Sequence, residues 1–345
     1  MPLETAHLGF FKITRCGYYK GRSPTPAFGS SLDMLADLEL WARGKQLAQT
    51  QTFQRVMNAN GDTLLPVFLY DIKRRGNEWL LVLWNQVPST NSQVASVMAN
   101  GSVGQAQIHM NNVVAGSIPG FATYFWFLPD RNVFANIRFQ HAIGGHAALQ
   151  TYIRSYLDRF SSHVDLDTTT GTSPFDMNIN GYRASPTDPV ENFSPRYKSF
   201  VFTKPGEHEL LIQQAHRITK VLRRTYLELQ TPEDLDVWQK LWRKLHQQQT
   251  VTTDTVSLQY EMKSSLSREA VQDIIQANDA DSSESTWDDI GFQLSGESSP
   301  RWLNKSYARD KFDLDIARQN AELVNLDSLF DALTKRRTAI LSLLD

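Results

Sequence analysis

The sequence lacks most of the features that mark specialised classes of protein. Cys16 is the only cysteine among 345 residues, which excludes an intramolecular disulfide and a thiolate metal cage. The longest apolar stretches, 79–84 and 121–128, are far shorter than the roughly 20 residues that cross a bilayer. The N-terminus has neither the basic start nor the apolar run of a signal peptide. We therefore expect a cytoplasmic protein without membrane insertion, in which Cys16 is a small hydrophobic residue.

Neither sign of charge is in large excess. The formal net charge is −2, so the whole chain exerts no strong attraction on a polyanion. The composition, 41% hydrophobic and 21% charged, is typical of globular proteins. The length favours two domains, because single cores stop growing beyond about 250 residues. Any nucleic acid must therefore bind to a local basic patch.

Sequence motifs of common catalytic and metal sites are also missing. The chain has no Walker-type phosphate loop, no Gly-x-Gly-x-x-Gly fingerprint and no Gly-x-Ser-x-Gly elbow. Three histidines, at 109, 141 and 146, lack an accompanying carboxylate and are expected to be ordinary side chains. The alternation His163-Val-Asp165-Leu-Asp167 resembles a set of metal ligands, but it opens a polar stretch where aspartate is common in turns. We predict no metal and no cofactor.

The first half of the chain predicts hairpins and helices. Two strand-like runs, 65–73 and 78–87, flank a turn that contains Gly76 and Asn77. A second pair, 121–128 and 133–141, flanks residues 129–132. The remaining predicted elements are a strand at 9–15, a helix from Ser30 or Ser31 to about Gly44, and a helix from Gly145 to about Phe160.

The second half predicts a sheet that packs against helices. Residues 209–229 have apolar positions at helical spacing, although their β-branched content leaves a strand open. Thr231 and Pro232 begin a clearer helix. The other predicted elements are strands at 197–203, 256–262, 290–294 and 303–316, a helix capped by Ser267, and a helix at 320–344.

These elements together predict the α+β class. Residues 165–195 are polar and have no sustained apolar period, which is typical of a linker or a surface loop. We therefore expect an N-terminal α+β domain at 1–164, with antiparallel hairpins and helices. A linker or long surface loop at 165–196 would follow. The C-terminal domain at 197–345 would be a β-α-β-β-α sheet packed against helices.

Basic residues cluster in the second half in spite of the balanced net charge. On a helix, Arg217, Lys220 and Arg224 would share one face, which suits contact with phosphates without base recognition. A further cluster lies at 335–337. The alternative is a solvated surface on which these cations pair with nearby acids. The predicted DNA-binding residues are Arg217, Lys220, Arg223, Arg224, Lys240, Arg243 and Lys244.

An enzyme remains the alternative. Glu261 and Lys263 lie two residues apart on a predicted strand, as in nucleases that place a metal-binding carboxylate beside a lysine. Asp254 or Glu269 would supply the second acid. The competing interpretation is the polar face of a half-exposed strand, because Glu-x-Lys is common by chance and the usual proline-aspartate partner is missing.

The order of the hydrophobic segments resembles the RexA family of phage-exclusion proteins from lambda-type prophages. The resemblance lies in Val67–Lys73 with Trp79–Leu83, in the aromatic strand Tyr124–Leu128 and in the final β-α-β-β-α unit. It covers most of the chain, which is longer than the family pattern at 165–195 and near the N-terminus. The resemblance implies DNA binding during phage infection, by a homodimer that acts with an effector protein.

The sequence therefore predicts a DNA-binding protein of antiviral defence that does not read base sequence and is not an enzyme. A metal-dependent nuclease that uses Glu261 and Lys263 is the first alternative. A structural adaptor subunit of a defence complex, which needs neither the carboxylate nor the basic residues, is the second.

Overall fold

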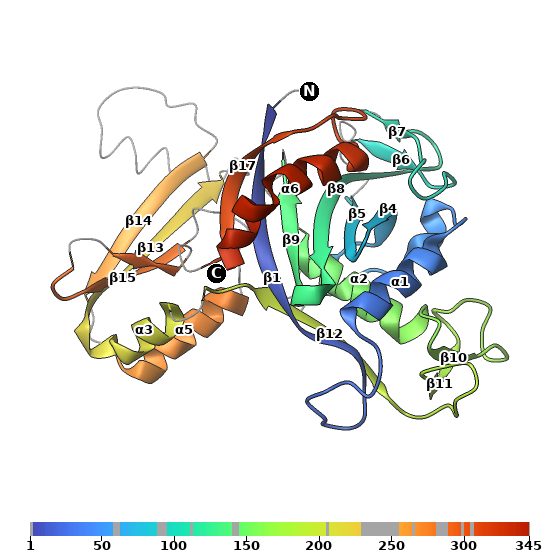
Figure 1. Cartoon of the computed structure of the whole chain (residues 1–345), viewed down its shortest axis with the longest axis horizontal. Coiled ribbons are helices and arrows are strands. Elements are labelled where there is room, and N and C mark those ends of the chain that lie inside the picture. Colours follow the sequence, from blue (N-terminus) through green and yellow to red (C-terminus); the bar gives the residue numbers. More distant parts are fainter. Residues whose placement is uncertain are drawn as a thin grey trace. The chain divides into compact units, whose positions relative to one another are not determined.

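A computed structural model of the chain confirms the α+β class (Figure 1). It describes residues 3–57, 63–87, 95–110, 113–139, 145–204, 207–228, 255–263, 266–280, 289–297, 300–303 and 307–344. None of the helices in these ranges is long and apolar enough to span a membrane.

The chain forms two compact units that do not follow the predicted boundaries. Unit 1 contains Met1–Phe202 and Ala308–Asp345, and unit 2 contains Thr203–Tyr307. The predicted linker lies within unit 1, where β10 (Val164–Asp167) pairs with β11 (Asn178–Tyr182). The end of the chain also belongs to unit 1, because β17 (Arg309–Asp315) pairs with the N-terminal strand.

Unit 1 is built on a curled antiparallel sheet in the order β12-β1-β9-β8-β5-β4 (Figure 1). The central element, β1 (Leu3–Tyr19), is long enough to pair with two strands on the same side. Its first half pairs with β17 and its second half with β12 (Ser194–Val201). The other strands are β4 (Val67–Arg75), β5 (Glu78–Gln86), β8 (Ser117–Leu128), β9 (Val133–Arg138), and the short β2 (Val56–Met57), β3 (Thr63–Leu64), β6 (Ser96–Met98) and β7 (Ile108–His109).

Both predicted hairpins are confirmed. β4 pairs with β5 across a turn in which Gly76 has φ +58, a left-handed conformation that glycine adopts without strain. β8 pairs with β9 beyond η2 (Pro129–Arg131), and Asn132 takes the left-handed conformation at φ 51. The turn residues therefore fix both registers.

Helices cover the two faces of this sheet. On one face, α6 (Leu326–Leu341) packs over a cluster that includes Phe10 and Trp126. On the other face, α1 (Ser31–Ala42) and α2 (His146–Arg159) enclose a second cluster with Phe125 and Phe134. The short 3-10 turns η1 (Leu47–Thr50) and η5 (Ser342–Leu344) complete unit 1.

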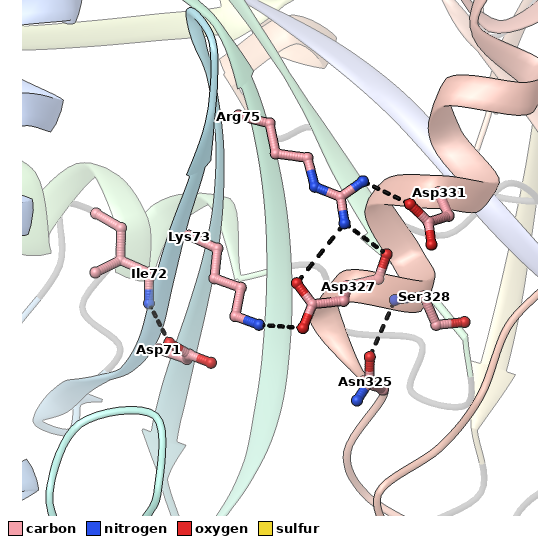
Figure 2. Close-up of polar contacts among 8 residues, drawn as sticks. All are labelled: Asp71, Ile72, Lys73, Arg75, Asn325, Asp327, Ser328 and Asp331. Carbon is pink, nitrogen blue, oxygen red and sulfur yellow. Dashed lines mark hydrogen bonds and ion pairs between the residues drawn. The ribbon is translucent and has the colours of Figure 1, made fainter.

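The start of α6 is held on β4 by charged side chains (Figure 2). The helix begins later than predicted, because the Asn325 side chain accepts from the Ser328 backbone N–H and caps it. Lys73 Nζ lies 2.5 Å from Asp327 Oδ2. Arg75 Nη1 lies 2.6 Å from Asp331 Oδ1, and its other amino group donates to the Asp327 carbonyl. These cations and acids fix the helix against the edge of the sheet.

Unit 2 is a smaller antiparallel sheet in the order β14-β13-β15-β16. Its strands are β13 (Ile218–Glu228), β14 (Thr255–Lys263), β15 (Asp289–Leu294) and β16 (Arg301–Trp302). Its helical elements are α3 (Glu207–Gln213), η3 (Ala215–Arg217) and α5 (Arg268–Ala280). Leu211, Val271, Ile275 and Phe292 are buried in this unit. The Ser267 cap is confirmed, since its hydroxyl accepts from the Ala270 N–H.

The helix predicted at 209–229 is wrong for most of its length. Only Glu207–Gln213 and a short 3-10 turn are helical, and the chain then becomes β13. The strand that the β-branched residues had left open is the observed structure. The helix predicted to begin at Thr231 lies outside the described residues.

Candidate nucleic-acid interface

The predicted basic face of a helix does not form, because the residues lie on η3 and β13. Arg217 ends η3, where its guanidinium donates to Gln214 Oε1 at 3.0 Å and to the Ser295 carbonyl at 2.8 Å. Lys220 Nζ lies 3.1 Å from Glu261 Oε1. Both cations are thus engaged in contacts within unit 2.

The other residues of this group are less constrained or are not described. Arg223 is exposed on β13. Arg224 lies on the same strand, but its side chain is not among the described ones. Lys240, Arg243 and Lys244 lie outside the described residues. Of the predicted set, Arg223 is therefore the described cation whose contacts leave it most available to a ligand.

The basic cluster at 335–337 lies on α6 and is partly paired. Arg337 Nη1 lies 2.8 Å from Glu78 Oε1, and Lys335 Nζ lies 4.0 Å from Asp315 Oδ2. Arg336 is exposed. This cluster resembles the alternative of a solvated helix face more than a phosphate-binding surface.

The geometry gives the nuclease alternative little support. Glu261 lies on β14 and pairs with Lys220, so its carboxylate is shared with a cation. Glu269 has a lowered pKa because the backbone N–H and the Ser267 side chain donate hydrogen bonds to it at the start of α5. The side chain of Lys263 is not described, and Asp254 lies outside the described residues. Within the described ranges, no group of three His, Cys, Asp or Glu side chains could hold a metal.

The remaining sequence candidates have structural contacts. His146 is buried, with Nε2 2.9 Å from Ser199 Oγ. His163 Nδ1 lies 3.0 Å from the Arg183 carbonyl, and Asp165 pairs with the Arg183 guanidinium. His109 lies on β7, and His141 is outside the described residues.

Cys16 is buried on β1, as predicted. Burial raises the pKa of its thiol to about 12, which makes the reactive thiolate scarce at neutral pH.

β4 carries a second carboxylate-x-lysine pattern, Asp71-Ile72-Lys73. Burial raises the pKa of Asp71, and one of its oxygens accepts from the Ile72 N–H at 2.8 Å. Lys73 extends instead to Asp327 on α6 (Figure 2). Because the lysine serves the packing of α6, this pattern does not form a catalytic pair.

A different set of cations gathers on β1 and β12, which the sequence analysis did not identify. Lys12 faces Phe200 in the register, Arg15 faces Lys198, and Arg196 faces Gly17. Residues that alternate with them, such as Tyr197 and Cys16, point into the core on the other side. We call Lys12, Arg15, Arg196, Lys198 and Phe200 the β1–β12 surface; the Tyr19 ring beside them is buried.

Aromatic rings hold the cations of this surface in place. Arg15 and Arg196 both lie over the Tyr19 ring, with guanidinium carbons 5.6 and 5.0 Å from its centroid. Lys198 Nζ lies 4.7 Å from the centroid of Phe200. Such contacts position a cation without neutralising its charge.

The four cations of the β1–β12 surface have no carboxylate partner among the described residues. The nearby Glu191 pairs with Lys20, at 2.8 Å. Lys12 and Lys198 are exposed. One buried nitrogen of Arg15, Nη1, has no hydrogen-bond partner among the residues that the structure describes. Within the described ranges, no acidic side chain pairs with these four cations.

Comparison with models of protein families gives no match, and comparison with curated protein sequences gives none either.

Proposed function

We propose that this protein binds nucleic acid, DNA in particular, without reading base sequence, through the β1–β12 surface. The observation that carries the proposal is a set of four cations on two adjacent strands, for which the described part of the chain offers no carboxylate partner. Phosphates attract such a surface through charge and the release of counterions, and these contacts carry no sequence information.

The two arginines of this surface support the same proposal. Arginine suits phosphate because its planar fork donates two parallel hydrogen bonds. We also propose that Arg223 and Arg224 of β13 contribute to nucleic-acid binding, and this contribution is tested separately.

The biological setting follows from the resemblance to RexA-type proteins. That resemblance favours a role in phage exclusion, as a homodimer with an effector protein. Expression of the protein in a phage-sensitive host should lower the efficiency of plating, and loss of DNA binding should abolish the effect.

The test measures DNA affinity over a range of salt concentrations by fluorescence anisotropy. The double variant Lys12→Ala/Lys198→Ala removes two exposed cations of the β1–β12 surface. Each lost phosphate contact lowers the slope of log affinity against log salt by about 0.7–0.9. We therefore expect a slope between about 1 and 2 units smaller than that of the wild type.

The matched control is Lys335→Ala/Arg336→Ala, which removes the same charge from exposed positions on α6. This variant should keep the wild-type slope. Equal losses in both variants would mean that only net charge matters. No binding of the wild type to any DNA at low salt would refute the proposal and favour the adaptor alternative. The triple change of Arg217, Lys220 and Arg224 to Ala tests β13 in the same assay.

A further inference from the structure

Phe200 is an exposed aromatic ring at one end of the β1–β12 surface, where it pairs with Lys12. Its side chain is 38% exposed, and it belongs to neither hydrophobic core cluster. Lys198 lies over the ring, and Lys12 lies opposite in the register. The exposed part of this ring is accessible to a ligand, and the two lysines beside it carry positive charge.

The shape of the surface does not select the form of the nucleic acid. A two-stranded ribbon can enter the major groove, which is about 12 Å wide. β9 pairs only with His7–Lys12 of β1, so Arg15, Arg196 and Lys198 lie where β1 pairs with β12 and not with β9. The choice between a duplex and a single strand therefore rests on the exposed aromatic ring.

The ring itself points to an unpaired base. A duplex hides the faces of its bases in the stack, whereas an unpaired strand exposes them to aromatic side chains. Phenylalanine has no polar atom and therefore interacts with a base only through its face. The cations at alternate positions of β12, Arg196 and Lys198, lie about 7 Å apart along the strand and would follow the phosphates.

We infer that the β1–β12 surface holds a single strand of nucleic acid, with one base stacked on Phe200 and the phosphates along Lys12, Lys198 and Arg196. This inference rests on the proposed function and adds the form of the nucleic acid. It follows the general design of single-strand sites, in which a positive track runs beside aromatic platforms.

The experiment compares three fluorescently labelled ligands of equal phosphate number. They are a thymidine single strand, a duplex, and an abasic single strand that has phosphates but no bases. The variants are Phe200→Ala, Phe200→Tyr, which keeps a ring, and Leu40→Ala, which truncates an exposed apolar side chain on α1. Thermal melting checks that each variant is folded.

We expect the thymidine strand to bind more tightly than the duplex. Phe200→Ala should weaken binding of the thymidine strand about tenfold and leave the abasic strand unchanged. Phe200→Tyr and Leu40→Ala should bind as the wild type does. Uridine strands with ribose and with deoxyribose separate RNA from DNA, and the loss in Phe200→Ala should appear with whichever of them binds.

Two results would overturn the inference. One is a duplex that binds as tightly as the thymidine strand. The other is a Phe200→Ala variant that loses no affinity, or that loses the same affinity for the abasic strand. Salt-dependent binding of all three ligands without a Phe200 effect would reject only the single-strand inference. No binding of any ligand would reject the proposed function as well.

Discussion

His146 makes the stability of unit 1 depend on pH. Its ring stacks on Phe11 with the centroids 4.1 Å apart, and its Nε2 lies 2.9 Å from Ser199 Oγ. Burial lowers the pKa of this histidine from 6.5 to about 4. The folded protein thus disfavours the charged imidazolium, whereas the unfolded chain accepts the proton readily.

The sign and size of the effect follow from this difference. In the unfolded chain His146 takes up a proton near pH 6.5, and in the folded protein only near pH 4. Its contribution is fully present above pH 6.5 and is lost as the pH falls toward 4. Between pH 7 and pH 5 the free energy of unfolding should therefore decrease by about 2 kcal/mol from this residue alone.

The assay is urea denaturation at pH 7 and pH 5, followed by tryptophan fluorescence. Other groups also titrate, so the comparison is between the wild type and His146→Gln. The variant should be less stable at pH 7 but should lose about 2 kcal/mol less between the two pH values. An identical pH dependence in both proteins would refute the buried, neutral state of this histidine.

Three further predictions concern other sites. Arg318 forms a fork with Glu4, at 2.7 and 2.6 Å, so Arg318→Ala should cost about 1.5–3 kcal/mol in denaturant unfolding, and a loss below 0.5 kcal/mol would contradict this. Cys16 should not react with a disulfide reagent at pH 8 unless the protein is unfolded, because its pKa is about 12; rapid reaction of the native protein would show an accessible thiol. Magnesium or manganese should not induce DNA nicking, and nicking that disappears in Glu261→Ala or Lys263→Ala would establish the nuclease instead.

The local elements were predictable where the chain itself carries the signal. Gly76 and Asn132 supply the left-handed turn conformations, and the apolar runs on either side supply the strands, so both hairpins followed from the sequence. The Ser30 cap of α1 followed from the same kind of local chemistry, since its hydroxyl accepts from the Asp33 N–H.

β13 shows why an apolar period can mislead. Ile218 and Leu222 are four residues apart, which matches one turn of a helix and also one face of a strand. The preceding apolar positions belong to α3 and η3. The helical spacing of apolar residues therefore continued past Arg217, where the helical structure ends and β13 begins. The β-branched residues Thr219 and Val221 were the signal for the strand.

The long-range pairings had no local signal. β1 joins β17, about 300 residues away in the chain, and β12, about 180 residues away. Only the packed sheet brings Lys12 and Arg15 beside Arg196 and Lys198. The density of basic residues along the chain therefore could not reveal the β1–β12 surface. For the same reason the predicted domain boundary at 165–196 did not correspond to the division between units.

The cations that cluster in the sequence and those without acidic partners are largely different residues. Lys220 and Arg337 come from conspicuous basic runs, yet each lies beside a carboxylate from another element. Lys12 and Lys198 stand in ordinary alternating strands, where Lys12 pairs with Phe200 and Val133, and Lys198 pairs with Arg15. A polyanion is attracted by charge that the fold leaves unbalanced, whatever the spacing in the chain. For a protein with a net charge of −2, the ion pairs of the folded structure therefore decide where positive charge remains accessible.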